Sequence, residues 1–199
     1  PRLGRGDHRE AAEGHGDLRE DLGVDDAADA EIGELDARGA GGERRRIDGL
    51  ELIRLDVFED DRGFLYEVVH DSDHFVPHIG QVYVVGDPSR GAIRAFHKHA
   101  ELHDWFCLVS GSAKFAFVDD RPASPTYRQA DSVIISGRRP TLIVVPPGVF
   151  HGWMSLEDHT IMLSVASHVY DRLAPDETRV SPHAFENVFG RDVWKVEAK

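Results

Sequence analysis

From Ile47 onward the chain is divided into short apolar runs by turn-forming residues, and this pattern constrains the fold more than any other feature. Most of the runs are rich in Val, Ile and aromatic residues, and each has about the length of a β-strand. They cover residues 50–58, 64–69, 81–85, 92–99, 105–110, 113–118, 132–135, 142–145, 152–156 and 160–166. Short strands at such close spacing indicate an all-β sandwich or barrel.

The chain has a different composition before residue 47. Residues 1–46 contain no Phe, Tyr or Trp, and their acidic side chains outnumber the basic ones. Such a segment cannot bury enough apolar surface to form a core. We expect a flexible, low-complexity extension over residues 1–46, with a hinge in the glycine run 39–42 and the arginines 44–46, and one domain over residues 47–199. Residues after about 180 are expected to form an irregular or partly helical tail.

Charge and hydropathy limit the classes of partner. The formal net charge of the 199 residues is −13, which disfavours general nucleic-acid binding because a duplex backbone requires a basic face. No apolar stretch of about 18 residues and no secretory leader is visible, so we expect no membrane contact and a cytoplasmic protein. The single cysteine, Cys107, lies among Trp105, Phe106 and Leu108, which predicts a buried and unreactive thiol.

Histidines are concentrated in one part of the sequence. His97, His99 and His103 lie within seven positions, and His151 follows a Pro-Pro-Gly turn. Residues i and i+2 of a strand share a face, so two imidazoles are expected to point into one cavity. The four histidines are also candidate ligands for a divalent Zn, Fe, Ni or Mn ion, although no cofactor is required by the other motifs.

The spacing around these histidines resembles the two signature motifs of the cupins. In the first motif, five residues separate Gly91 from His97-Lys98-His99, and His103 and Gly111 follow. The second motif is Pro147-Gly148-x-x-His151. In this comparison His103 stands where cupins usually have Glu. The resemblance implies a double-sheet jelly roll in which histidines from facing strands line the interior.

A narrower resemblance covers about residues 47–180 and identifies the chain as a divergent member of the dTDP-4-dehydrorhamnose 3,5-epimerase family. The matching motifs are Asp61-Arg62-Gly63-x-x-x-Glu67, Gln81, Arg94-x-x-His97, Asp119-Asp120-Arg121-x-x-Ser124-Pro125-Thr126-Tyr127, Pro147-Gly148-x-x-His151-Gly152 and Tyr170.

The resemblance implies an isomerase that acts on a dTDP-4-keto-6-deoxyhexose by proton abstraction next to the ketone, without a cofactor, as a homodimer. Its implied site places Arg62 and Arg94 on the diphosphate. The other implied site residues are His97 as the base, Tyr170 as a further catalytic group, and Glu67, Gln81 and His151 as substrate contacts.

Three departures from the family pattern leave alternatives open. Asp104 stands near the family's lysine, Ser164 stands near its tyrosine acid, and we expect the C-terminal aspartate that pairs with the base to be missing. The enolate formed by proton abstraction needs a stabilising group, for which Lys98, Tyr127 and Tyr170 are candidates. The alternatives are a sugar 3,4-ketoisomerase, a noncatalytic sugar-nucleotide-binding cupin and a metal-dependent cupin enzyme.

The spacing of two implied site residues also predicts a backbone irregularity. Arg94 and His97 are three residues apart, which places them on opposite faces of a regular strand. We therefore expect a β-bulge between them if both side chains face one cavity.

Overall fold

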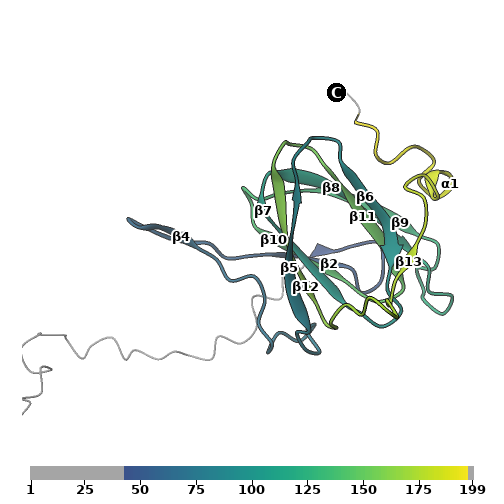
Figure 1. Cartoon of the computed structure of the whole chain (residues 1–199), viewed down its shortest axis with the longest axis horizontal. Helices are drawn as coiled ribbons and strands as arrows, with labels where there is room; N and C mark the ends of the chain where they lie inside the picture. Colours follow the sequence, from purple (N-terminus) through teal and green to yellow (C-terminus); the bar gives the residue numbers. More distant parts are fainter. Residues whose placement is uncertain (1–42, 197–199) are drawn as a thin grey trace, which may run out of the picture. The chain divides into compact units, whose positions relative to one another are not determined.

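The computed structural model describes residues 43–196, which form two antiparallel sheets packed face to face (Figure 1). The six-stranded sheet contains, in spatial order, β1 (Glu43–Arg44), β2 (Glu51–Arg54), β10 (Thr141–Val145), β7 (Asp104–Ser110), β12 (Thr160–Ala166) and β5 (Gln81–Asp87). The five-stranded sheet contains β13 (Thr178–Arg179), β6 (Ile93–Lys98), β11 (Val149–Ser155), β8 (Ser112–Asp119) and β9 (Ala130–Ser136). A separate hairpin joins β3 (Phe58–Asp60) to β4 (Gly63–Leu65), and one short helix, α1, spans Glu186–Phe189.

Side chains from both sheets form the main core. Phe106 of β7 packs with Phe115 of β8, and Trp153 of β11 stacks on Phe115 with ring centroids 6.2 Å apart. All three are at most 4% exposed. The all-β, double-sheet jelly roll predicted from the sequence is confirmed.

The C-terminal tail packs on the outer face of the five-stranded sheet. Val193 and Trp194 are each 4% exposed and join a cluster with Phe96 and Phe150. The Trp194 Nε1–H donates to the Pro182 carbonyl at 2.9 Å. The predicted irregular and partly helical tail is therefore confirmed, and its aromatic residues hold it in place.

Several predicted boundaries were wrong. The run 50–58 is interrupted after Arg54, and of the run 64–69 only its first two residues are in a strand, because charged turn residues close a tight hairpin there. The run predicted for residues 152–156 begins earlier, because β11 (Val149–Ser155) starts directly after the Pro147-Gly148 turn and already contains His151.

Most of the predicted N-terminal extension, residues 1–42, lies outside the described residues. Its last part differs from the expected flexible hinge. Arg45 donates from Nε and Nη2 to the Asp131 carboxylate at 2.9 Å, a forked ion pair with a side chain that is 9% exposed. The start of the described chain is thereby fixed to β9.

Two smaller expectations were also tested. Cys107 is 1% exposed, and burial raises the pKa of its thiol to about 11, so the predicted unreactive thiol is confirmed. Among the described residues, no helix has the length and apolar character needed to cross a membrane.

The predicted β-bulge lies in β6. His97 pairs with His151 and Arg94 pairs with Trp153, so Ala95 and Phe96 together oppose the single residue Gly152. Arg94 and His97 consequently face the same cavity, as the bulge hypothesis required. A Cβ atom on Gly152 would lie 2.3 Å from the Ala95 Cβ and 2.6 Å from its Cα, so only glycine fits.

A buried carboxylate fixes the turn between β8 and β9. Asp119 is fully buried and accepts hydrogen bonds from the Arg121 guanidinium and from the hydroxyls of Ser124 and Thr126, at 2.6 to 2.8 Å. Burial alone would raise the pKa of Asp119, but these hydrogen bonds outweigh it and hold that pKa well below 3.8. Arg121 and Thr126 also bond the backbone of Asp48, so this network ties the first core residues to the turn.

We predict that Asp119→Asn lowers the free energy of unfolding by about 1.5–3 kcal/mol at pH 7, the range for hydrogen bonds to a charged group. Because the pKa is lower in the folded state, the unfolded chain takes up the proton first as the pH falls. The wild-type advantage should therefore shrink below about pH 4 in urea denaturation curves. Asp120→Asn, which removes a more exposed ion pair with Lys98, is the control. An equal difference at pH 7 and pH 3 would contradict this explanation.

We predict that Gly152→Ala lowers the free energy of unfolding by about 1–3 kcal/mol, because the new methyl group collides with backbone atoms of β6. Thermal denaturation measures this loss. The matched control is Gly86→Ala in β5, where a Cβ would meet nothing within 4 Å, and a change within about 0.5 kcal/mol is expected there. Equal stability of the two variants would show that β6 and β11 separate easily.

Candidate active site

A cavity of about 590 Å³ opens between the two sheets. Its walls are mainly apolar, with Phe106, Phe115, Trp153 and Met162 among them, and a few polar side chains converge on it, as is usual for small-molecule sites. Of the residues predicted from the sequence, it is lined by Gln81, Arg94, His97, His99, His151 and Tyr170.

Three predicted histidines meet at one end of this cavity. The ring centroids of His97 and His151 are 4.2 Å apart, and those of His97 and His99 are 5.5 Å apart. One ring nitrogen from each of the three histidines lies within 4.8 Å of the others. The β6–β11 register, in which His97 pairs with His151, places these rings side by side.

The prediction that His103 belongs to this cluster was wrong, and its neighbour Asp104 takes the place. Successive residues face opposite sides as β7 begins. His103 stacks on Trp105, which belongs to a separate cluster from the core between the sheets. Asp104 faces inward, is 2% exposed, and places Oδ2 3.3 Å from His99 Nε2 and 3.4 Å from His151 Nε2. The alternation of side chains along a strand, applied one residue further on, would have predicted Asp104 in this place.

Two of the three imidazoles are held by backbone carbonyls. His151 donates its Nδ1–H to the Val149 carbonyl at 3.0 Å, and His99 donates its Nδ1–H to the Asp176 carbonyl. The Asp176 carboxylate in turn accepts the backbone N–H groups of Ala100, Glu101 and Leu102 at 2.7 to 3.0 Å. A neutral ring that donates from Nδ1 has its lone pair on Nε2, so both Nε2 lone pairs face Asp104.

His97 differs from its two neighbours. Within the described residues, no hydrogen bond to either ring nitrogen fixes its orientation, and burial, followed by the charges of His151, His99 and Arg179, lowers its pKa to about 2. The ring is therefore neutral at physiological pH and has a lone pair available to accept a proton. A negative charge that forms next to it would raise this pKa, because it stabilises the imidazolium.

A tyrosine that the sequence analysis missed lies opposite Ser164. Tyr83 of β5 pairs with Ser164 of β12, so the two side chains share the cavity face of the sheet. Tyr83 as a whole is 39% exposed, but burial of its hydroxyl end, reinforced by the charge of Asp104, raises its pKa to about 12. The phenol thus keeps its proton next to the position where the family pattern expects a tyrosine.

The C-terminal segment adds charged groups that were not predicted. Glu177 and Arg179 line the cavity, and the Arg179 Nε donates to the Glu177 carboxylate at 2.9 Å. The C-terminal segment does place an aspartate, Asp176, beside the cluster. Its carboxylate, however, caps backbone N–H groups and does not contact His97.

The remaining predicted residues occupy different places. Arg94 lines the cavity and pairs with the buried Asp87 at 2.8 Å. Arg62 is 87% exposed in the β3–β4 hairpin and pairs with Asp60, and Glu67 is 56% exposed beside His70. Neither lines the cavity of its own chain. Lys98, a candidate for enolate stabilisation, pairs with Asp120 and is likewise absent from the lining.

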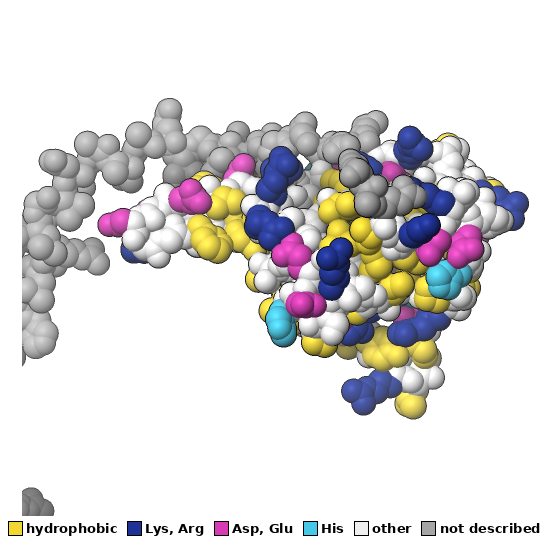
Figure 2. Space-filling model, turned by 90° about the horizontal axis from the view of Figure 1, so that it is seen from above, with side chains coloured by type: hydrophobic (Ala, Val, Ile, Leu, Met, Phe, Trp, Pro, Cys, Tyr) yellow, Lys and Arg dark blue, Asp and Glu magenta, His cyan; other side chains and the backbone are white. Residues whose placement is uncertain are grey.

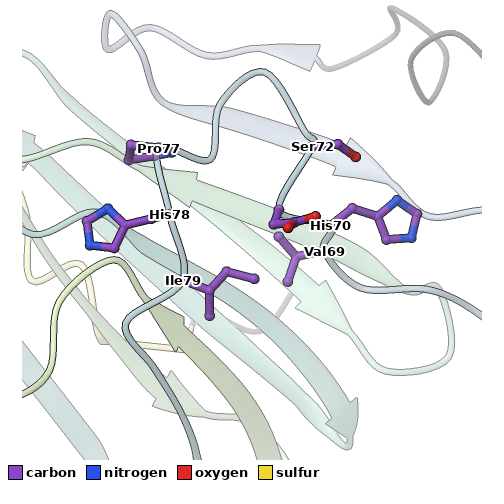
Figure 3. Close-up of a pocket in the computed structure, with 7 residues that line it drawn as sticks. Val69, His70, Ser72, Pro77, His78 and Ile79 are labelled. Carbon is purple, nitrogen blue, oxygen red and sulfur yellow. The ribbon is translucent and has the colours of Figure 1, made fainter.

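A second hollow lies in the loop between β4 and β5. It is lined by Val69, His70, Asp71, Ser72, Pro77, His78 and Ile79. The rings of His70 and His78 lie on opposite sides of it and point away from each other (Figure 3). Because these groups do not converge, the hollow is not a catalytic site.

Comparison with known proteins agrees with this geometry. The family model described as dTDP-4-dehydrorhamnose 3,5-epimerase matches residues 44–185. The spore coat polysaccharide biosynthesis protein SpsL of Bacillus subtilis is 32% identical over 136 residues, which cover 67% of this chain and 89% of SpsL. The probable low-salt glycan biosynthesis epimerase Agl13 of Haloferax volcanii is 30% identical over 139 residues, covering 67% and 87% of the two chains.

Solved structures show the same fold. The RmlC epimerase of Mycobacterium tuberculosis superposes with a TM-score of 0.66 at 25% identity, covering 74% of this chain and 76% of its own. The sequence prediction of a divergent member is thereby confirmed: the chain belongs to the dTDP-4-dehydrorhamnose 3,5-epimerase family.

Proposed function

We propose that this protein is a nucleotide-sugar epimerase or isomerase that removes a proton next to the ketone of a dTDP-4-keto-6-deoxyhexose. The observation that carries the proposal is the position of His97, whose imidazole faces the cavity between the sheets beside His151 and on the same strand as Arg94. Such a group can accept a proton from a substrate carbon and return it. Family membership supplies the substrate class.

Tyr83 is the acid in this proposal. Epimerisation requires a proton to reach the face of the sugar opposite the base, and a phenol with a raised pKa holds that proton until the enolate forms. The family's tyrosine position is Ser164 here, and Tyr83 reaches the same part of the cavity from the neighbouring strand. Tyr170, predicted as catalytic from the sequence, lines the cavity with 48% of its surface exposed and donates its backbone N–H to Gln81.

Arg94 and Arg179 are the diphosphate contacts that the chain itself provides. Both line the cavity and both remain largely exposed, at 52% and 76%. Each donates only Nε to its carboxylate partner in the bonds described above. The guanidinium Nη groups can therefore form charge-assisted bonds to phosphate oxygens, which lets an acidic protein bind an anion locally.

The exposed apolar hairpin supports a homodimer. Phe58, Phe64 and Leu65 are 60%, 71% and 59% exposed. Figure 1 shows the hairpin projecting from the sheets, and Figure 2 shows hydrophobic side chains along it with acidic ones at its tip. The nearby strand β5 is an open sheet edge. A second copy that covers these surfaces would bring Arg62 and Glu67 to its cavity, which explains why they lie outside their own. A cytoplasmic location remains part of this proposal.

Isotope exchange tests the reaction. With dTDP-4-keto-6-deoxyglucose in deuterated water, a 3,5-epimerase introduces deuterium at C3 and C5, whereas a 3,4-ketoisomerase labels C3 and C4 only. We expect His97→Asn to abolish exchange, because the proton acceptor is lost. Tyr83→Phe should retain exchange but lower the rate of inversion by about 100-fold or more.

The tyrosine outside the cavity provides the control for this experiment. Tyr127→Phe changes a phenol on the β8–β9 turn and should preserve both exchange and inversion. If inversion is lost in Tyr170→Phe and kept in Tyr83→Phe, Tyr170 is the acid. A wild-type protein that binds the substrate and exchanges no proton would be a noncatalytic binding protein.

Mixing two inactive variants tests whether Arg62 of one subunit enters the cavity of the other. If Arg62 serves the cavity of the second copy, a mixed dimer of Arg62→Ala and His97→Asn subunits has one complete site. In that site the His97 of the first subunit meets the Arg62 of the second. Random pairing should restore about one quarter of wild-type activity. Phe64→Ser should weaken the dimer in analytical ultracentrifugation, while Ile134→Ser, an exposed change on β9, should not. No recovery of activity on mixing would place Arg62 outside the site.

A further inference from the structure

A buried group of acceptor atoms in the cavity lacks a donor. Asp104 Oδ2 lies 3.3 Å from His99 Nε2 and 3.4 Å from His151 Nε2. Since both rings donate Nδ1–H to backbone carbonyls, all three facing atoms are acceptors when the rings are neutral. Asp104 Oδ2 and His151 Nε2 have no hydrogen-bond partner among the described residues.

These three atoms belong to side chains that are at most about one-tenth exposed. Buried polar atoms without a partner are costly, and a single cation at the centre satisfies all three acceptors at once.

We propose that His99, Asp104 and His151 bind a divalent first-row transition metal ion. The two distances from Asp104 Oδ2 to the histidine nitrogens, 3.3 and 3.4 Å, match the edge of a tetrahedral site with bonds of about 2.0–2.1 Å. Two neutral imidazoles and one carboxylate select Zn, Fe, Co, Mn or Ni over the oxygen-preferring Ca and Mg.

The surroundings resemble those of a prepared metal site. In metal centres, the second nitrogen of a histidine ligand is normally fixed by a carbonyl or carboxylate, which sets the tautomer and the direction of the ring. Val149 and Asp176 provide these carbonyls here. His97 is not anchored in this way and has no ion pair with Asp104, although one of its ring nitrogens lies within 4.8 Å of ring nitrogens of His99 and His151. We therefore assign the ion to His99, Asp104 and His151 and proton transfer to His97.

The ion would also compensate for a missing charge, and this role rests on the function proposed above. Asp104 replaces a lysine of the family pattern, which would otherwise stabilise an enolate oxygen. A three-ligand metal with an open position can polarise a ketone in the same way. Metal binding itself requires no substrate, so the site and the reaction can be tested separately.

The test measures metal binding by the full chain without an affinity tag. After chelator treatment and dialysis, the protein is titrated with Zn²⁺ alone in a calorimeter, and its metal content as purified is measured by mass spectrometry. We expect one ion per chain. Single variants His99→Ala, Asp104→Asn and His151→Ala should each weaken binding by at least about 100-fold, since a loss of 10–100-fold is typical even of outer contacts.

Two controls separate this site from surface binding. His103→Ala removes the neighbouring histidine that faces away, and His183→Ala disrupts an exposed His183, Glu186 and Asp192 group that is also arranged for a metal. Neither should change the affinity for the first ion. Equal binding in all three ligand variants, loss of the ion in His183→Ala alone, or a wild-type protein that binds no Zn²⁺ at millimolar concentration would overturn the proposal.

A measurement on the wild-type chain covers the case in which a ligand variant does not fold. Co²⁺ gives strong visible absorption in a four- or five-coordinate site and weak absorption as the hydrated ion. The proposal predicts strong bands that reach saturation at one equivalent and disappear when Zn²⁺ is added. A spectrum of hydrated Co²⁺ would overturn it whatever the outcome of the isotope-exchange experiment.

Discussion

The contact between Gly152 and Ala95 determines the geometry of the whole site. Two residues of β6 face one residue of β11 at this point, which is possible only because Gly152 has no side chain. The resulting bulge turns Arg94 and His97 to the same side while His97 still pairs with His151. The proposed phosphate contact, Arg94, and the proposed base, His97, thereby face one cavity although they are three residues apart on one strand.

The entry to β11 depends on a second buried interaction. The Asp119 carboxylate holds Arg121, and the Arg121 side chain packs so closely on Gly148 that a Cβ there would lie 2.4 Å from Arg121 Cγ. Gly148 is three residues before His151. Residues 119–127 are one of the motifs that resemble the family. They do not line the cavity, but they fix the turn at Gly148 from which β11, the strand of His151, starts.

The sequence predicted those features that depend on local periodicity. The all-β class followed from short apolar runs at close spacing, the double-sheet jelly roll followed from the resemblance to the cupin motifs, and the bulge followed from the three-residue spacing of Arg94 and His97. His103 was predicted in the cluster that Asp104 joins, an error of one position. Neighbouring residues of a strand point to opposite faces of the sheet, so this error moves a side chain from the cavity face to the other face. Tyr83 was missed because its relation to Ser164 is a pairing between strands distant in sequence. The position of Arg62 depends on a hairpin that leaves the sheets, which no local pattern reveals.

The bonds made by Asp176 connect the segment after His99 to the stretch just before β13, 74 to 76 residues further along the chain. During synthesis on a ribosome, all the histidines of the cavity emerge well before this segment does. His99 has no carbonyl to fix its ring until residue 176 has left the exit tunnel and β13 has added to β6. The arrangement of His99 can thus be completed only after every strand up to β12 has been synthesised.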